Sequence, residues 1–401
     1  PDGNHLEESG GDGGMKWEYK TLDQLGTVSR GKSKHRPRND PKLFGGKYPF
    51  IQTADVKNAD YYITKYSDTY NESGLAQSKL WDKGTLCITI AANIADTGVL
   101  AFPACFPDSI MGFVPFEGVA NTRFIKYCFD RLQRDCKQIS QGTAQDNLSW
   151  EKLSTIKFCI PEYKEQCRIA DILSAYDDLI ENNQKQIKLL EEAAQRLYKE
   201  WFVDLRFPGH ENTKIVDGVP EGWKKERLVD IAEIQYGYAF DGTLFNADKN
   251  GTPIIRIRNI PQAETMDYTT EHVSENYLVQ NGEIIVGMDG EFHINAWAGN
   301  TAYLVQRVCC IRPKNTEIKG WLLQAIYEPI KFFEHTVVGA TVSHLGKKHL
   351  DSIYLLTSPE EFYKPFKTFF DKRLLLMNQN RKLREARDRL LPKLMSGKVK
   401  V

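Results

Sequence analysis

The chain repeats itself at a separation of about 200 residues, and this duplication constrains its fold more than any other feature. Trp17 begins a pattern of apolar residues and glycine that recurs with identical spacing from Trp223, 206 residues later. The segment GTLCITI (84–90) resembles GEIIVGM (282–288), and further matches follow in the same order in both halves. A period of this length is too long for a solenoid. The sequence therefore predicts two copies of one domain type.

Each copy begins with short runs typical of β-strands and continues with a long helical segment. The runs IQTADV (51–56) and PIIRIRNI (253–260) are expected to be strands. The helical segments carry a seam at alternating steps of four and three, which predicts helices packed along their length against another helix. The first seam comprises Ile169, Leu173, Tyr176, Ile180, Asn183, Ile187, Leu190, Ala194, Leu197 and Trp201. The second, with charged interruptions, comprises Phe362, Phe366, Phe369, Arg373, Leu376, Asn380, Leu383, Arg387, Leu390 and Leu394.

A helix of about 40 residues is roughly 60 Å long, which is too long to lie on one domain of this size. The natural partner of each long helix is therefore the other one, in antiparallel orientation. The predicted fold class is α+β. Two similar α/β domains are joined by two long antiparallel helices that form a coiled-coil rod, with a pseudo-two-fold internal repeat.

Two details of the seams bear on helix register. Asn183 and Asn380 both fall on the seam, 197 residues apart. Asn inside a seam fixes register at a cost in stability, and the alternative is that both lie at a solvated edge. EAAQRL (192–197) matches EARDRL (385–390) at an offset of 193. The first helix thus has four extra residues between the asparagine and this element, a stutter of about one turn.

The predicted organisation has six parts. They are a disordered leader (1–14), a first α/β domain (15–161), a first long helix (162–205), a linker (206–222), a second α/β domain (223–358) and a second long helix (359–401).

Composition and motifs argue against an enzyme. The 53 Lys and Arg residues balance 53 Asp and Glu residues, which excludes nucleic-acid binding through bulk positive charge but not through local basic patches. Walker, zinc-protease, nucleophile-elbow and dinucleotide-binding motifs are absent from the sequence, so we predict no catalytic, cofactor-binding or metal-binding residue. No apolar run approaches the roughly 18 residues of a membrane span. The eight cysteines follow no zinc or disulfide pattern, which favours reduced thiols in the cytoplasm.

Two motifs carry a resemblance to a known family. LYKEWFVDLRFPG (197–209) followed by PEGW (220–223) resembles the middle of type I restriction-modification specificity subunits. The ending RLLPKLMSGKV (389–399) resembles the end of the same family. With the duplicated halves, the resemblance covers nearly all of residues 15–401. The second seam departs from the first by carrying more charge.

The resemblance implies a DNA-binding subunit that is not an enzyme by itself. Residues 15–161 and 223–358 would be target-recognition domains, each reading one half of a split double-stranded DNA sequence. The two long helices would be conserved regions that set the spacing and dock two methyltransferase (modification) subunits. The resemblance also implies restriction or motor subunits. S-adenosylmethionine, ATP and Mg would be held by these partners and not by this chain.

Candidate DNA contacts follow from the resemblance and from the chemistry of base recognition. Cations contact phosphates, Arg pairs with guanine, Asn or Gln with adenine, and acidic groups accept from cytosine. In the first copy the candidates are Arg30, Lys32, Lys34, Arg36, Arg38, Gln52, Thr53, Asn93 and Gln145. In the second copy they are Arg256, Arg258, Asn259, Asp289, Glu291, Thr341, His344, Lys347 and Lys348.

Each of these segments also has a simpler interpretation. Strand alternation would place Arg256 and Arg258 on one face, where they could form only a surface salt-bridge ladder. The basic loop (30–38) and the acidic residues could be solvated, and the segment GATVSHLGKKH (339–349) could be a structural turn. The aromatic residues at the helix ends are expected to pack against a helix or a domain. They are Tyr198, Trp201, Phe202, Phe362, Phe366, Phe369 and Phe370.

Two other classes of function stay open on the sequence alone. One is a structural rod protein whose two heads bind protein, which the zero net charge favours slightly. The other is a cysteine hydrolase, which would require a Cys within reach of a His.

Overall fold

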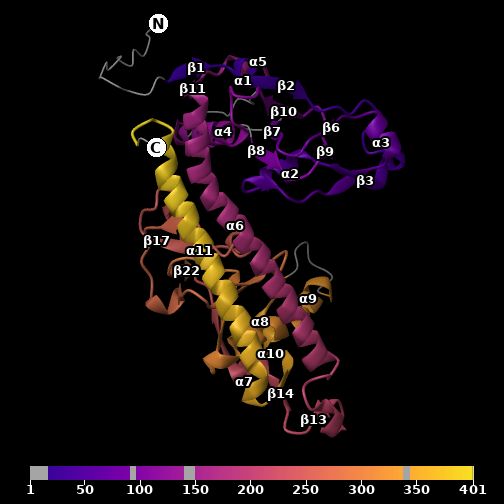
Figure 1. Cartoon of the computed structure of the whole chain (residues 1–401). Coiled ribbons are helices and arrows are strands. Elements are labelled where there is room, and N and C mark those ends of the chain that lie inside the picture. The colour runs from indigo at the N-terminus through magenta and orange to yellow at the C-terminus, as the bar shows by residue number, and fades with distance from the viewer. Residues whose placement is uncertain (1–16, 91–95, 140–149, 337–343, 400) are drawn as a thin grey trace. The chain divides into compact units, whose positions relative to one another are not determined.

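The computed structural model describes residues 17–90, 96–139, 150–336, 344–399 and 401 (Figure 1). It divides into two compact units: unit 1 contains Pro1–Asp178 and Arg384–Val401, and unit 2 contains Leu179–Leu383. Among the helices in these described ranges, none is both long and apolar enough to cross a membrane.

The described part of unit 1 contains two sheets and a two-stranded pair. The larger sheet has the order β2 (Gly26–Arg30), β10 (Ile110–Pro115), β7 (Leu86–Thr89), β8 (Thr97–Leu100), β4 (Tyr62–Ile63). The smaller sheet has the order β5 (Asp68–Tyr70), β3 (Phe44–Phe50), β9 (Ala104–Cys105), β6 (Leu80–Trp81). The pair is β1 (Glu18–Lys20) with β11 (Phe158–Ile160). The helices before the first long helix are α1 (Leu22–Leu25), α2 (Thr53–Lys57), α3 (Glu72–Ala76), α4 (Thr122–Ile139) and α5 (Trp150–Thr155).

Unit 2 is built on the same plan. One sheet has the order β15 (Ala232–Tyr236), β23 (Val308–Pro313), β20 (Ile284–Gly287), β21 (Ile294–Ala296). The other has the order β16 (Phe245–Asn246), β18 (Tyr268–Thr269), β17 (Thr252–Ile255), β22 (Ala302–Leu304), β19 (Leu278–Val279). Two pairs are β14 (Lys224–Arg227) with β24 (Tyr354–Thr357), and β12 (Ile215–Val216) with β13 (Val219–Pro220). The short helices are α7 (Leu228–Ile231), α8 (Lys319–Ala325), α9 (Tyr327–Thr336) and α10 (Lys347–Asp351).

The strand registers show that the duplication is structural. In unit 1, β9 pairs in parallel with β3 and antiparallel with β6 through the same residue, Cys105. In unit 2, β22 pairs in parallel with β17 and antiparallel with β19, and Tyr303 takes the place of Cys105 in both ladders. Since register is set by which side chains face the core, matching ladders mean that the two copies bury matching faces.

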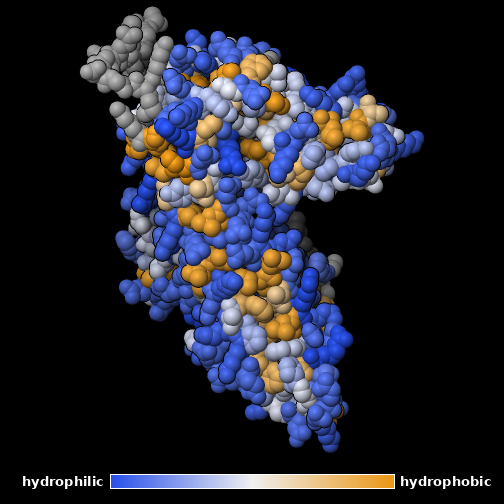
Figure 2. Space-filling model, in the orientation of Figure 1, coloured by the Kyte–Doolittle hydropathy of each residue, from blue (hydrophilic) through white to orange (hydrophobic). Residues whose placement is uncertain are grey.

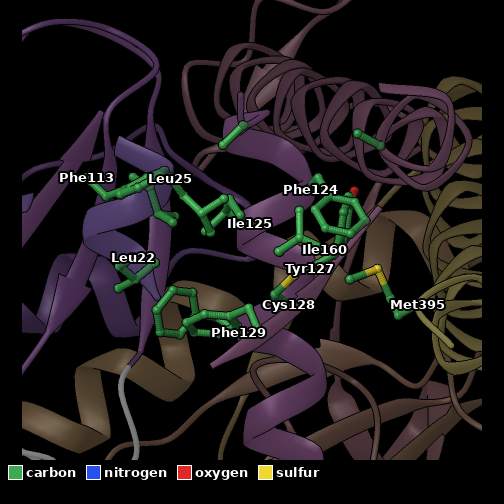
Figure 3. Packing of buried hydrophobic residues seen from close by; sticks show 14 of the residues in the cluster. Leu22, Leu25, Phe113, Phe124, Ile125, Tyr127, Cys128, Phe129, Ile160 and Met395 are labelled. Atoms are coloured by element: carbon green, nitrogen blue, oxygen red, sulfur yellow. The ribbon is translucent and has the colours of Figure 1, made fainter. Parts of the chain in front are cut away.

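The core of unit 1 gathers the sheet, α4 and parts of both long helices. Leu22, Leu25, Phe113 and Phe124 are fully buried in one cluster with Met395, which follows the second long helix (Figure 3). Residues of the first long helix, among them Ile169 and Leu173, belong to the same cluster. Burial of each such side chain contributes ~1.5–3 kcal/mol, so the helix segments are part of the folded domain.

The long helices are α6 (Tyr163–Tyr198), which continues through a π-helical turn (Lys199–Val203), and α11 (Lys364–Leu394). In unit 2 their aromatic ends pack on the strand domain, as predicted. Phe202 lies 4.9 Å from Trp223 and 5.8 Å from Trp321 and from Phe366, measured between ring centroids. Such aromatic contacts add to the apolar burial and hold the helix ends on the domain.

The seam within unit 2 is an antiparallel helix pair. The Asn183 Nδ2 donates to Asn380 Oδ1 at 2.9 Å, and both residues are 2% exposed. Further along, Arg373 Nε donates to Glu191 Oε1 at 2.6 Å, so residue numbers rise along α6 as they fall along α11. The alternative of a solvated edge for the two asparagines is wrong. The predicted fold class, mixed helix and sheet with two repeats and long antiparallel helices, is confirmed.

The charged interruptions of the second seam are partners of acids on α6. Besides Arg373, Arg387 donates to the buried Asp177 in unit 1, and Tyr127 Oη donates to the other oxygen of Asp177 at 2.5 Å. A buried carboxylate is tolerable when paired in this way. The extra charge of the second seam is therefore part of the helix packing.

Candidate nucleic-acid interface

The basic segment after β2 is a loop whose backbone is fixed to unit 1. Lys32 N donates to Phe106 O at 3.0 Å, and Ser78 Oγ donates to Lys32 O at 2.7 Å. The five predicted cations are all exposed: Arg30 at the end of β2, and Lys32, Lys34, Arg36 and Arg38 in the loop. A fixed backbone with exposed cations is suited to phosphate contacts.

Two of these cations are engaged within the loop region. The Arg36 guanidinium folds back to donate to Ser33 O and His35 O, at 2.7 and 2.8 Å. Arg38 forms an ion pair with Asp108 at 2.8 Å. Arg36 therefore shapes the loop, whereas an exposed ion pair such as Arg38–Asp108 is weak and can exchange for a phosphate.

The end of the loop is held by Asp40. Its carboxylate accepts from the backbone N of Lys42 at 3.0 Å and lies 2.9 Å from His35 Nε2. The Lys42 N–H, together with the His35 hydrogen bond, lowers the pKa of Asp40 below its usual value. The carboxylate is thus charged at neutral pH and caps the helical turn that follows.

A hollow in unit 1 brings together candidates from separate parts of the sequence. A pocket of about 360 Å³ is lined by Arg38, Gln52 and Thr53, together with Asp68 and Ser109. Gln52 Nε2 donates to Asp68 Oδ2 at 2.6 Å, which fixes its amide. An amide with a fixed orientation is suited to base recognition, because Gln can pair with adenine through two hydrogen bonds.

The predicted strand face for Arg256 and Arg258 is wrong. The strand β17 ends at Ile255, and a 3₁₀ turn follows at Ile257–Asn259. The turn begins because Asn259 Oδ1 accepts from Arg256 N at 2.8 Å, which satisfies a backbone donor that a strand would have used.

The matching segment of unit 1 departs from the prediction in the same way. The run IQTADV was expected to be a strand, yet β3 ends at Phe50 and Thr53–Lys57 is helical. Here Asp55 Oδ2 accepts from Gln52 N at 2.8 Å. An acceptor side chain three residues after the position of Gln52 or Arg256 is a capping pattern, and it was the sequence signal for both turns.

The arginines of this turn in unit 2 have separate partners. Arg258 forms an ion pair with Asp267 at 2.5 Å, and Asn259 Nδ2 donates to the same carboxylate at 3.3 Å. Arg256 lies over the ring of Phe245, at 5.5 Å from its centroid. The salt-bridge interpretation thus holds for Arg258 and not for Arg256.

A second group in unit 2 centres on Asp289. His344 Nδ1 lies 2.5 Å from Asp289 Oδ1, and Arg307 Nη1 lies 3.0 Å from Oδ2. Asp289 and His344 were predicted, whereas Arg307 was not, because it stands alone in a short segment with no basic or polar pattern around it.

The remaining described candidates are exposed at the surface of unit 2. The Glu291 carboxylate lies 3.5 Å from His293 Nδ1. Lys347 pairs with Asp351 at 2.8 Å within α10, and Lys348 is exposed beside it. The candidates Asn93, Gln145 and Thr341, like the predicted leader 1–14, lie outside the described residues.

Comparison with known proteins assigns the family. The type I restriction modification DNA specificity domain matches residues 15–192 and 220–361. The chain therefore belongs to this family and contains two copies of its domain.

Individual relatives agree with this assignment. The type I restriction enzyme MjaIX specificity subunit of Methanocaldococcus jannaschii is 26% identical over 96% of this chain and 94% of its own length. The EcoBI specificity subunit of Escherichia coli is 31% identical over 35% of this chain and 30% of its own. The fold is similar to that of the type I restriction-modification S subunit from M. genitalium, with a TM-score of 0.54 at 15% identity, over 98% of this chain and 97% of that one.

Proposed function

We propose that this chain is the DNA sequence-specificity subunit of a type I restriction-modification enzyme and is non-catalytic by itself. The two strand domains, 15–161 and 223–358, each read one half of a bipartite double-stranded DNA target. One observation carries this proposal. In both copies a side chain three residues on caps the backbone where the strand ends, but the capped residue is Gln52 in one copy and Arg256 in the other. A shared frame with different hydrogen-bonding groups is suited to reading two different half-sites.

Local charge supports DNA as the ligand despite the zero net charge. The exposed cations of the loop 30–38 adjoin the pocket with Gln52 and Thr53, since Arg38 belongs to both. Phosphate contacts would position the duplex, and the side chains of the pocket would contact base edges.

The long helices, 162–205 and 359–401, are the proposed docking surface for two methyltransferase subunits. Along these helices unit 2 exposes large apolar side chains, Leu179 and Leu189 on α6 and Leu375 on α11. Figure 2 shows apolar patches over the stretch of surface where these helices run. Contiguous apolar patches on a surface are typical of protein–protein contact sites.

The proposed complex also includes restriction or motor subunits. In it, S-adenosylmethionine would be bound by the methyltransferase partners, and ATP and Mg by the restriction partners. The complex would act on DNA in the cytoplasm.

Exchange of one domain tests the proposal. Residues 15–161 would be replaced by the equivalent segment of a relative with another target, and the complex with methyltransferase subunits would be mapped for methylated sites. One half of the target should change while the other half and the gap stay the same. The control exchange, 223–358, should change the opposite half. If either exchange alters both halves, the two domains do not read independently.

The second candidate is a structural rod protein with two protein-binding heads, favoured by the balanced overall charge and by the lack of a basic stripe in the sequence of the predicted rod. DNA binding with a steep salt dependence separates the two, because release of counterions accompanies phosphate contacts. Binding of the full chain, with its methyltransferase partners, to duplex DNA should weaken strongly between 50 and 200 mM salt. No binding at either concentration would favour the rod protein.

A further inference from the structure

Arg307 is held at a fixed place in the turn between β22 and β23. Its φ of 69° lies in the left-handed region, which non-glycine residues seldom adopt. The turn is anchored on both sides: Gln306 N donates to Tyr238 O at 2.7 Å, and Met288 N donates to Arg307 O at 2.8 Å. The backbone position is thus held by the segments that follow β15 and β20, while the side chain is 66% exposed.

The Asp289 carboxylate orients the Arg307 side chain through an ion pair. Asp289 is only 15% exposed, and its two oxygens are taken up by Arg307 and His344. A carboxylate can only accept, so the His344 Nδ1 carries the hydrogen and, in the neutral ring, Nε2 is an acceptor. Asp289 therefore orients both the Arg307 guanidinium, which donates, and the His344 ring, whose Nε2 accepts. Both carboxylate oxygens of Asp289 face these two partners.

The internal repeat places Arg307 among the base-contact candidates. In unit 1 the backbone bond from Ile90 N to Ser109 O, at 3.1 Å, matches the bond from Met288 N to Arg307 O. Ser109 is thus the counterpart of Arg307, and it lines the pocket that contains Gln52 and Thr53. The ion pair that orients the Arg307 side chain and the equivalence of Arg307 to Ser109 are independent observations, and both support a base contact by Arg307.

We propose that Arg307 is a specificity-determining residue of the second domain, with Asp289 as its positioning residue. This inference rests on the proposed function and deepens it. Arg307 reads a guanine in the half-site of unit 2 by donating to O6 and N7, the contact that a guanidinium makes in the major groove. Asp289, predicted from sequence as an acceptor for cytosine, orients Arg307 and His344 and does not contact a base.

Selection from a randomised duplex DNA library tests the inference. The full chain, assembled with its methyltransferase subunits, would be compared with Arg307→Ala and Arg307→Lys, and the enriched sequences determined. Both variants should lose the preference for guanine at one position of one half-site, by roughly tenfold to a hundredfold, and keep every other position. Lysine is included because it keeps the charge but lacks the two-pronged geometry.

Arg227 provides a matched control. It also lies in unit 2 and forms an Arg–Asp ion pair, with Asp230 at 2.9 Å, but at β14, which pairs with β24. Arg227→Ala should leave the selected sequence unchanged. If the wild type selects a DNA motif and Arg307→Ala selects the same motif, the inference about Arg307 is wrong while the proposed function still stands. If the wild type selects no motif, the proposed function itself fails.

The positioning role of Asp289 has its own outcome. Asp289→Asn keeps the shape of the side chain and removes the charge that holds Arg307. The variant should weaken the guanine preference at the same position as the Arg307 variants and at no other. Loss of preference at a different position would show that Asp289 reads a base itself, and the assigned role would be wrong.

Discussion

Replacing Asn183 by Leu should destabilise the protein by ~1–3 kcal/mol, the cost of leaving a buried polar group without its partner. Asn and Leu have the same number and branching of side-chain heavy atoms, so leucine keeps the shape of the side chain with a moderate increase in volume. The Asn380 Oδ1, in a residue 2% exposed, would lose the donor that now lies at 2.9 Å. The Asn380 amide would keep only its donation to Ile180 O, at 3.3 Å. Asn380→Leu should have a similar effect.

The double variant Asn183→Leu/Asn380→Leu should be far more stable than the sum of the single changes predicts. It removes both amides, so no buried group is left unsatisfied. The loss of one hydrogen bond, ~0.5–1.5 kcal/mol, is then offset by apolar burial at a seam position. The expected coupling between the two sites is ~2 kcal/mol, within the range measured for residues in contact.

Urea unfolding of the four proteins in this cycle, followed by circular dichroism, measures the coupling. Asn182→Leu is the control, because Asn182 is exposed and adjacent on the same helix, and its change should stay within ~0.5 kcal/mol. The reasoning would be refuted if Asn183→Leu matched the wild type, or if the two single effects simply added. Either result would mean that the amide pair is not buried in the folded seam.

Two further predictions concern spacing and thiols. Deletion of four residues, 184–187, from the stutter of α6 would shorten the helix by about 6 Å. On the proposed function, the preferred gap should then change by about one or two base pairs, and methylation-site mapping with an unchanged gap would contradict it. Burial raises the pKa of Cys309 to about 12 and that of its neighbour Cys310 as well. Both thiols should therefore resist iodoacetamide at pH 8 until guanidinium unfolds the protein, and mass spectrometry would reveal labelling of the native protein if they do not.

The sequence predicted the long-range plan because its signals were periodic and repeated. The heptad steps that include Ile180, Asn183 and Asn380 needed only spacing to predict a helix seam. The duplication independently identified the other helix as the partner. In the structure Asn183 donates a hydrogen bond to Asn380 across this seam. The heptad spacing and the duplication, each weak alone, together predicted this contact.

Local prediction was wrong where a capping side chain competed with β-type composition. The run containing Ile255 and Ile257 alternates as a strand does, and this alternation predicts a strand that continues past Arg256. In the structure Asn259 captures the Arg256 backbone N–H and starts a turn. Secondary structure at such points is decided by one hydrogen bond and not by the average propensity of the segment.

The grouping of candidate residues into one site could be predicted only where they are close in sequence. The loop 30–38 concentrates its cations and was therefore recognisable. Asp289 and His344 are 55 residues apart, and Arg307 joins them only because β22 and β23 bring their connecting turn to the end of β20. A single arginine forms no local sequence pattern from which this long-range contact could be predicted.

The two copies show why the class of function can be predicted from sequence while the bases that are read cannot. Backbone registers match residue by residue, from Cys105 and Tyr303 in the ladders to Ser109 and Arg307 in the turns. The ladder positions Cys105 and Tyr303 are constrained by burial, and buried positions of this kind leave a periodic trace in the sequence. The exposed polar groups on the frame obey no such constraint, because packing does not limit them and each half-site selects its own. A duplicated DNA-recognition domain should therefore keep its buried core and vary its exposed polar residues. The contrast between Ser109 and Arg307, which occupy equivalent backbone positions in the two copies, agrees with this expectation.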